Sequence, residues 1–224
     1  QEQFSSQVQR YSKIGFTDFK IKLSGKFQLD NDNISHVNTT ITNSRIRLDA
    51  NNLWKDWRSA ADYIKKLGFN FLGVEEPLAH GDFEGMKKFS NSTNTPIILD
   101  ESFLRFDHFN QIESSPKNWL INLRISKMGG ILRSIEIANQ AKNLGLPLII
   151  GAQVGETSIL SRAALSIANH YRDLVTAQEG AFGTYLLEKD ITEDPIMFGK
   201  GGVLESSSIT TNGYGWGMNV RALE

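Results

Sequence analysis

Short apolar runs alternate with longer amphipathic stretches along most of the chain. The runs are rich in Val, Ile, Leu and Phe and predict strands, namely FKIKL, SRIRLDA, FLGVEEP, PIILDES, WLINLRIS, LPLIIGA and LVTAQEG. Segments with helical periodicity lie between them, namely WRSAADYIKKLG, FEGMKKFSNS, LRSIEIANQAKNLG and TSILSRAALSIANHY. Gly68 and Gly145 are expected to end two of these helices in a left-handed conformation. The Asn-, Thr- and Ser-rich stretch 26–44 predicts a helix poorly. Repeated strand–helix units are typical of an α/β fold with a parallel sheet.

Polar residues mark the ends of the predicted strands at intervals of about 25 residues. They are Lys22, Asp49, Glu75, Asp100, Arg124 and Glu179, with Gly151 in the same series. Seven strand–helix units of this size, each ending in a polar group, are the layout of a (β/α)₈ TIM barrel, whose chemistry lies at the C-terminal ends of its strands. We therefore expect that barrel class.

Composition supports one large globular domain with a small-molecule partner. The chain has 224 residues, of which 40% are hydrophobic, so it can bury one sizeable core. Its formal net charge is -1, without a basic stripe, and this argues against nucleic acid or an acidic membrane surface as a partner. The absence of cysteine and of any apolar run of about 18 residues favours a soluble, cytoplasmic protein without a membrane partner.

Three successive predicted strand ends are carboxylates. Asp49 stands in RLDANN, Glu75 in VEEPL and Asp100 in ILDES. Mg²⁺ prefers oxygen ligands, and three carboxylates from neighbouring strands would supply half of an octahedral site. Alternatively, each carboxylate caps the helix that follows it. Their occurrence in successive units favours a shared metal site.

Two lysines alternate on one predicted strand. Lys20 and Lys22 are two residues apart in FKIKL, so they share one face of the strand. If that face lines the barrel mouth, each ammonium group makes loss of a proton from the other easier, which suits a general base. Phe19, Ile21 and Leu23 would then pack under the helices. Alternatively, the two lysines lie on a solvated edge of the sheet and have no catalytic role.

The motifs FKIKL, DANN, VEEPL, LDES and a later segment ending in GG together resemble the muconate-lactonising subgroup of the enolase superfamily. This resemblance implies an enzyme that abstracts a proton α to a carboxylate and stabilises the enolate on Mg²⁺, or on Mn²⁺ in its place. The residue roles that it implies are Asp49, Glu75 and Asp100 as metal ligands, Lys22 as the acid/base with Lys20 as its neighbour, and Asn51 and Glu179 as contacts to a small carboxylate substrate.

One position departs from the subgroup pattern. The subgroup carries K-x-x-K-x-G-G, and counting back from Gly130 places Arg124 at the first lysine and Lys127 at the second. Alternation along the strand, in which Arg124 shares a face with Ser126, agrees that Arg124 faces the site. Arginine stays protonated at ordinary pH, so it is a poor base but a good electrostatic clamp.

This departure decides which reaction we expect. It favours an isomerase or lyase that uses one base, either a syn elimination like that of o-succinylbenzoate synthase or a cycloisomerisation like that of muconate. The alternatives are an epimerase or racemase of the same superfamily, and a degenerate barrel that binds a ligand without turnover. A purely structural protein is disfavoured, because barrel stability does not require charges at these strand ends.

Two further acidic residues have open roles. Glu156 belongs to GAQVGETS, which is either a backbone-donor loop for an anion or a tight connection in which Thr157 or Ser158 caps the next helix. We interpret Glu156 as part of such a connection. Glu179 either contacts substrate, as the resemblance implies, or forms a structural ion pair.

The resemblance also predicts the domain organisation. We expect residues 1–197 to form the barrel domain with strands two to eight, preceded by the helix QEQFSSQVQRYSKIG. Residues 198–224 are expected to pack toward an N-terminal capping domain that, with the first barrel strand, is missing from this chain. Seven strands alone would leave two unpaired edges. The sequence is compatible with a homo-oligomer but does not indicate one.

Overall fold

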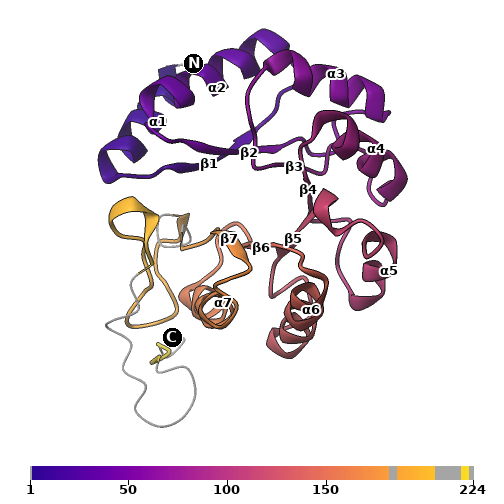
Figure 1. Cartoon of the computed structure of the whole chain (residues 1–224). Coiled ribbons are helices and arrows are strands. Elements are labelled where there is room, and N and C mark those ends of the chain that lie inside the picture. The colour runs from indigo at the N-terminus through magenta and orange to yellow at the C-terminus, as the bar shows by residue number, and fades with distance from the viewer. Residues whose placement is uncertain (1, 182–185, 205–217, 222–224) are drawn as a thin grey trace. The chain divides into compact units, whose positions relative to one another are not determined.

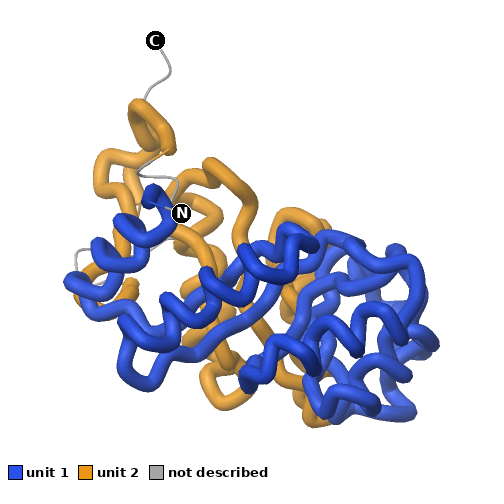
Figure 2. Tube along the Cα trace, turned by 90° about the horizontal axis from the view of Figure 1, so that it is seen from above, with its two compact units in different colours: residues 1–121 blue, residues 122–224 orange. Residues whose placement is uncertain are grey.

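The computed structural model describes residues 2–181, 186–204 and 218–221. The chain divides into two compact units, residues 1–121 and residues 122–224, which Figure 2 colours separately. The boundary falls inside one strand, β5 (Trp119–Leu123). No helix within the described residues is long and apolar enough to cross a membrane.

Unit 1 contains five parallel strands that pair in chain order. They are β1 (Asp18–Lys22), β2 (Arg45–Asp49), β3 (Gly73–Glu75), β4 (Ile97–Leu99) and the first part of β5. Helices lie along one side of these strands (Figure 1), namely α1 (Glu2–Ile14), α2 (Phe27–Thr40), α3 (Trp57–Leu67) and α4 (Phe83–Thr93). The connection from β4 to β5 holds η1 (Phe106–His108), α5 (Phe109–Ile112) and η2 (Pro116–Asn118).

Unit 2 continues the strand–helix alternation from the end of β5. Its elements are α6 (Ile131–Leu144), β6 (Leu148–Ile150), α7 (Ser158–His170), β7 (Val175–Gln178) and η3 (Lys200–Gly202). The Gly151 N–H donates to the Leu123 carbonyl oxygen, and β6 pairs with β7 in parallel. The part of the predicted C-terminal segment between residues 205 and 217, and residues 222–224, lie outside the described residues.

All seven predicted strands and the predicted helices are confirmed, with shorter strands than the apolar runs suggested. Gly68 (φ 72°) and Gly145 (φ 66°) end α3 and α6 in the left-handed conformation. The poorly predicted stretch forms α2, whose Ile34 and Val37 side chains are fully buried. Burial of this apolar stripe therefore outweighs the weak helix propensity of the Asn and Thr residues around it.

The capping alternative for the strand-end carboxylates is wrong for Asp49 and Glu75. The N-cap of α3 is Asp56, whose side chain accepts hydrogen bonds from the Arg58 and Ser59 amides. The N-cap of α4 is Asp82, which accepts from the Gly85 amide. Each helix is thus capped by an aspartate several residues after the strand, and the carboxylates at the strand ends serve another purpose.

The cap of α7 also differs from the prediction. Thr157 occupies the N-cap position, but its side chain makes no capping hydrogen bond. Instead, Asp190 Oδ2 accepts from the Ser158 amide (3.0 Å) and from Ser158 Oγ (2.7 Å). Its Oδ1 accepts from the Thr192 amide and from Thr192 Oγ1, both at 3.0 Å. A carboxylate 32 residues along the chain therefore holds the start of α7.

We predict that Asp190→Asn destabilises the protein at neutral pH. Burial alone would raise the pKa of the Asp190 carboxyl, but the hydrogen bonds from Ser158 and Thr192 hold it below its ordinary value of 3.8. The carboxylate thus adds stability above pH 3.8, and this contribution is lost as the pH falls through the lower pKa of the folded state. The side-chain NH₂ group of the asparagine would face the donors of Ser158 or Thr192 without an acceptor. We therefore expect the free energy of unfolding to fall by about 1–3 kcal/mol.

Urea unfolding at pH 7 and near pH 3 measures this effect. The exposed Asp194→Asn is the matched control and should change little at either pH. A deficit of Asp190→Asn that is as large at pH 3 as at pH 7 would contradict the proposed role of the carboxylate charge.

Candidate functional site

The predicted site residues fall into two groups, one in each unit. Unit 1 holds Lys20, Lys22, Asp49, Asn51, Glu75 and Asp100, and unit 2 holds Arg124 and Glu179. All of them lie in or within two residues of the C-terminal end of a strand. The predicted placement at strand ends is therefore confirmed within each unit.

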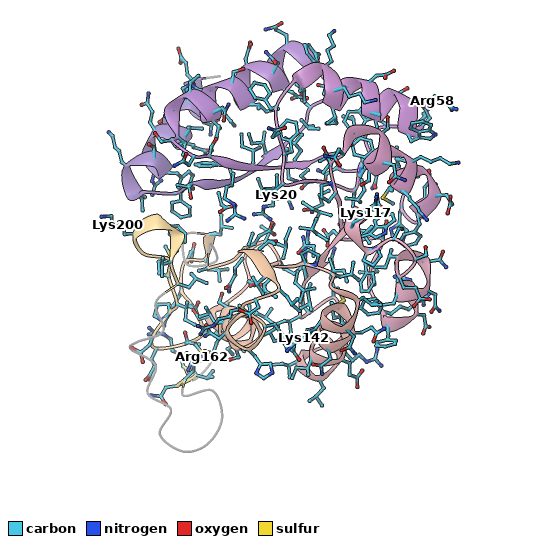
Figure 3. All side chains as sticks on the ribbon, in the orientation of Figure 1. Lys20, Arg58, Lys117, Lys142, Arg162 and Lys200 are labelled. Carbon is cyan, nitrogen blue, oxygen red and sulfur yellow. The ribbon has the colours of Figure 1, made fainter. Side chains whose placement is uncertain are left out.

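Parallel pairing brings the residues of unit 1 together. Lys22 lies opposite Asp49, and Asp49 lies opposite Glu75 in the register of β1, β2 and β3. Lys20 shares their face of the sheet because it is two residues before Lys22. Figure 3 shows Lys20 on the side of the strands away from the helices. Ile21, which points to the opposite face, is buried, so the predicted orientation of this strand is confirmed.

Lys20 is the centre of the site in unit 1. Its Nζ lies 2.7 Å from Glu75 Oε1 and 3.2 Å from Asp49 Oδ2. The two carboxylate side chains are only 3% and 8% exposed, whereas the Lys20 side chain is 21% exposed. Loss of one member of such a buried ion pair leaves an uncompensated charge and typically costs about 3–5 kcal/mol. Lys22, by contrast, is exposed.

Asn51 holds the other oxygen of Asp49. Its side-chain Nδ2 donates to Asp49 Oδ1 at 2.7 Å, and its backbone N–H donates to the same oxygen at 3.3 Å. Asn51 adopts a left-handed conformation with φ of 45°, which asparagine tolerates better than most residues. Both Asp49 oxygens are therefore oriented, one by Lys20 and one by Asn51. The predicted contact of Asn51 with substrate stays a prediction.

Glu76 fixes the backbone at Asp100, a role that the sequence analysis missed. Its Oε1 accepts from the Asp100 and Ser102 amides, both at 2.8 Å, and its Oε2 accepts from Ser102 Oγ at 2.7 Å. Burial raises the pKa of the Glu76 carboxyl, although these hydrogen bonds oppose the shift. Strand alternation does not indicate this role, because β3 ends at Glu75 and Glu76 has φ of 40°. The signal in the sequence is the acidic pair in VEEPL.

Asp30 anchors the loop that follows β1, and the sequence analysis also missed this residue. Its carboxylate is buried and accepts hydrogen bonds from the Ser24 amide and Ser24 Oγ (2.7 Å), from the Gly25 amide (3.1 Å) and from the Tyr63 hydroxyl (2.6 Å). Burial and the neighbouring Asp30 carboxylate raise the pKa of Tyr63. Asp30 thus ties the end of the lysine-bearing strand to α2 and α3.

The donor set of unit 1 fits a hard cation in its chemistry. Within the described part of the chain, no three His, Cys, Asp or Glu side chains form a cluster that could hold a metal ion. However, Asp49, Glu75 and Asp100 are 6%, 2% and 1% exposed, and buried carboxylates are unfavourable without cations. Lys20 already draws two of these carboxylates around one positive charge. A bound Mg²⁺ would compete with Lys20 for the same oxygens.

Arg124 is the predicted site cation that lies in unit 2. It follows β5 directly, and its Nη1 lies 3.5 Å from Gln153 Oε1. A Cβ atom added at Gly151 would lie 2.8 Å from Arg124 Cγ and would overlap Asn122 Oδ1, so this position requires glycine. Residues 125–129 form turns, so the strand alternation that we extended to Ser126 is wrong. Arg124 nevertheless lies beside the end of β6, as expected for a site residue.

Glu156 lies close to Arg124, which the sequence analysis did not anticipate. Its Oε2 accepts from the Gln153 amide at 2.9 Å. Burial and, to a smaller extent, the negative charge of Glu179 raise the pKa of Glu156. The hydrogen bond from the Gln153 amide and the positive charge of Arg124 lower it, and the net shift is upward. The Glu179 amide donates to the Ile150 carbonyl oxygen at 2.7 Å, which places Glu179 at the end of β7. The cation Arg124 and the acids Glu156 and Glu179 are therefore close enough to interact within unit 2.

The family follows from a comparison with known proteins. The family described as enolase C-terminal domain-like matches residues 3–223. The chain belongs to this family. The resemblance noted from the motifs is thereby confirmed. The expected metal ligands and bases remain predictions for this member of the family.

Curated relatives of this enolase-family chain include epimerases and racemases. The N-succinyl-L-Arg/Lys racemase of Bacillus cereus is 27% identical over 192 residues, which cover 85% of the chain and 50% of the racemase. The L-Ala-D/L-Glu epimerase of Bacillus subtilis is 30% identical over 179 residues, which cover 77% of the chain and 48% of the epimerase. The chain spans about half the length of these relatives.

Solved structures agree with this assignment. The dipeptide epimerase of Enterococcus faecalis, complexed with Mg and the dipeptide L-Leu-L-Tyr, has a TM-score of 0.81 at 25% identity and matches 96% of this chain and 59% of its own. The muconate cycloisomerase of Pseudomonas fluorescens shares the fold, with a TM-score of 0.78 at 22% identity over 96% of this chain and 59% of its own. The curated relatives named above are a racemase and an epimerase, which matches our alternative better than elimination or cycloisomerisation.

We predict that Asp30→Asn loosens the loop that carries the lysine strand into α2. The amide cannot accept from all four donors around it, so we expect the free energy of unfolding to fall by about 1–3 kcal/mol. Urea unfolding measures the change. The control is Asp32→Asn on the same helix, where the Gln28 side chain donates at an exposed position, and a change below about 0.5 kcal/mol is expected there. Equal effects of the two variants would contradict the anchoring role.

Proposed function

We propose that the protein is an enolase-superfamily isomerase that abstracts the proton α to the carboxylate of a dipeptide or an N-acyl amino acid. The single observation that carries this proposal is the lysine strand in register with two buried carboxylates, Lys20 and Lys22 beside Asp49 and Glu75. The substrate class comes from the relatives, which are named for dipeptides and N-succinyl amino acids.

Lys22 is the proposed acid/base. Its ammonium group lies on the same strand face as Lys20 and is exposed, so a substrate can reach it. In its neutral form, Nζ accepts the α-proton and the electron pair of the C–H bond moves into the substrate carboxylate. Lys20, on the same strand face, contributes a second positive charge next to this step.

Asp49, Glu75 and Asp100 are the proposed holders of Mg²⁺. When bound there, Mg²⁺ would supply positive charge to the substrate carboxylate as a Lewis acid. The chain supports each ligand separately, since Asn51 orients Asp49 and Glu76 fixes the backbone at Asp100. Loss of such supporting contacts typically weakens metal affinity by about 10- to 100-fold.

We predict that Asp100→Asn weakens Mg²⁺ binding at least about 10-fold, because one ionic oxygen donor becomes neutral. Isothermal titration calorimetry measures the affinity, and the adjacent exposed Glu101→Gln is the matched control. Lys20→Met should bind Mg²⁺ more tightly than the unmodified protein, since it removes the cation that shares the oxygens of Asp49 and Glu75. Unchanged affinity in Asp100→Asn would sink the proposed ligand set.

A second candidate function is a one-base elimination or cycloisomerisation. The observation that favours it is Arg124, which stands where the subgroup pattern has a lysine. An arginine steadies a developing negative charge but rarely gives up a proton. The two functions differ in whether one or both faces of the α-carbon exchange protons with solvent.

Deuterium exchange separates these functions. We predict that the full-length protein, incubated with Mg²⁺ in D₂O, introduces deuterium into both stereoisomers of an N-succinyl amino acid or dipeptide and interconverts them. Proton NMR and chiral chromatography follow the two processes, and Lys22→Ala should lose exchange from one isomer by about 10²–10⁴-fold. Exchange of one isomer without inversion would support the one-base reaction instead. No exchange of any substrate in the panel would favour a barrel that binds without turnover.

A further inference from the structure

The ends of β2, β3 and β4 carry the proposed Mg²⁺ ligands, and the following inference rests on that proposed site. Asp49 and Glu75 are the last residues of β2 and β3, and Asp100 directly follows β4. All three strand ends and the loops after them belong to unit 1. Ligands on separate loops converge on one ion only if the loops are held to one another. The contacts between these loops therefore decide how well the carboxylates can share a metal.

Glu76 contacts all three of these segments. Its carbonyl oxygen accepts a hydrogen bond from the Asn52 amide at 2.7 Å, in the loop after β2. Its own amide donates to the Ile98 carbonyl oxygen of β4 at 3.2 Å. Its side-chain Oε1 accepts from the Asp100 and Ser102 amides, both at 2.8 Å. One residue therefore connects the segments that carry the three carboxylates.

Ser102 extends this connection along the loop after β3. Its hydroxyl donates to Glu76 Oε2 at 2.7 Å and accepts from the Gly81 amide at 3.0 Å. Glu76 and Ser102 are each 1% exposed, so water does not compete for these contacts. Loss of an acceptor would leave buried N–H groups unpaired, which folded proteins rarely tolerate. The geometry of this network is therefore well defined.

The backbone of Glu76 adopts an unusual conformation. Its φ is 40°, in the left-handed region that glutamate rarely adopts. Asn51 and Asn52 share this region, with φ of 45° and 57°, but asparagine tolerates it better. Such strain persists only where surrounding contacts hold it, and it is concentrated at functional sites. Because Glu76 directly follows Glu75, the contacts that hold its strained backbone also hold the end of β3.

We propose that Glu76 is a positioning residue that holds the three Mg²⁺-binding strand ends in one frame. Its carboxylate acts through the backbone amides of Asp100 and Ser102 and does not itself bind the metal, since both of its oxygens already accept hydrogen bonds from the chain. The property that matters is therefore its ability to accept these hydrogen bonds and not its charge.

Two substitutions separate hydrogen bonding from charge. Glu76→Gln and Glu76→Met remove the same negative charge, but only the glutamine keeps an oxygen that can accept from the Asp100 and Ser102 amides. In the full-length protein, we expect Glu76→Met to bind Mg²⁺ about 10- to 100-fold more weakly than Glu76→Gln, as measured by isothermal titration calorimetry. Equal affinities of the two variants would overturn the positioning role.

Two further variants make the test independent of folding. Ser102→Ala removes the hydroxyl between Glu76 and Gly81 and should weaken Mg²⁺ binding less than Glu76→Met, since the Asp100 amide keeps its acceptor. It carries the test if Glu76→Met does not fold, and unchanged affinity would then overturn the inference. Asp56→Ala removes the N-cap of α3 and lowers stability without touching the network. A loss of affinity there as large as in Glu76→Met would also overturn it.

A second measurement needs no metal. Amide hydrogen exchange followed by mass spectrometry in EDTA, on the peptide that covers residues 97–104, reports the Asp100 and Ser102 amides. We expect faster exchange in Glu76→Met than in Glu76→Gln, because only the methionine leaves these amides without an acceptor. The same exchange rate in both variants would contradict the proposed contacts.

The outcomes distinguish the inference from the proposed function. Weaker Mg²⁺ binding in Asp100→Asn together with equal affinities of the two Glu76 variants overturns the inference and leaves the proposed ligand set standing. Unchanged affinity in Asp100→Asn removes the ligand set itself, and with it this inference.

Discussion

The burial of negative charge at the strand ends is the constraint on which the site of unit 1 depends. Asp49, Glu75 and Asp100 are almost inaccessible to water, and ionised carboxylates tolerate this only beside cations or hydrogen-bond donors. Lys20 supplies one cation at 2.7 Å and 3.2 Å from two of them. The parallel register of β1, β2 and β3 determines that these groups meet, so the chemistry of the site follows directly from strand pairing.

The residues that define this arrangement could be predicted from local pattern. Alternation along FKIKL placed Lys20 and Lys22 on one face, and the spacing of strand ends placed Asp49 and Glu75 beside them. Both arguments work because a strand has a two-residue repeat and parallel strands end at one edge of the sheet. Alternation failed at Ser126, because β5 ends at Leu123 and a turn has no such repeat.

The supporting groups could not be predicted in this way. Asp30 meets Tyr63 over 33 residues, Glu76 meets Ser102 over 26, and Asp190 meets Ser158 over 32. No local periodicity encodes such pairs, since their spacing depends on how two helices or loops happen to meet. Residue type alone also points elsewhere, because Asp and Ser near helix starts typically indicate local capping. A carboxylate that binds backbone amides at a distance produces the same pattern of residues.

Arg124 shows how far one substitution constrains a reaction. A lysine at this position could exchange a proton, whereas an arginine can only hold charge and donate hydrogen bonds. The space around it is specific, because Gly151 leaves no Cβ and Arg124 Cγ occupies the volume beside it. The loop after β6 supplies its neighbours, since Gln153 Oε1 lies 3.5 Å from Arg124 Nη1 and the Gln153 amide donates to Glu156 Oε2, so the arginine is held beside a carboxylate that balances its charge.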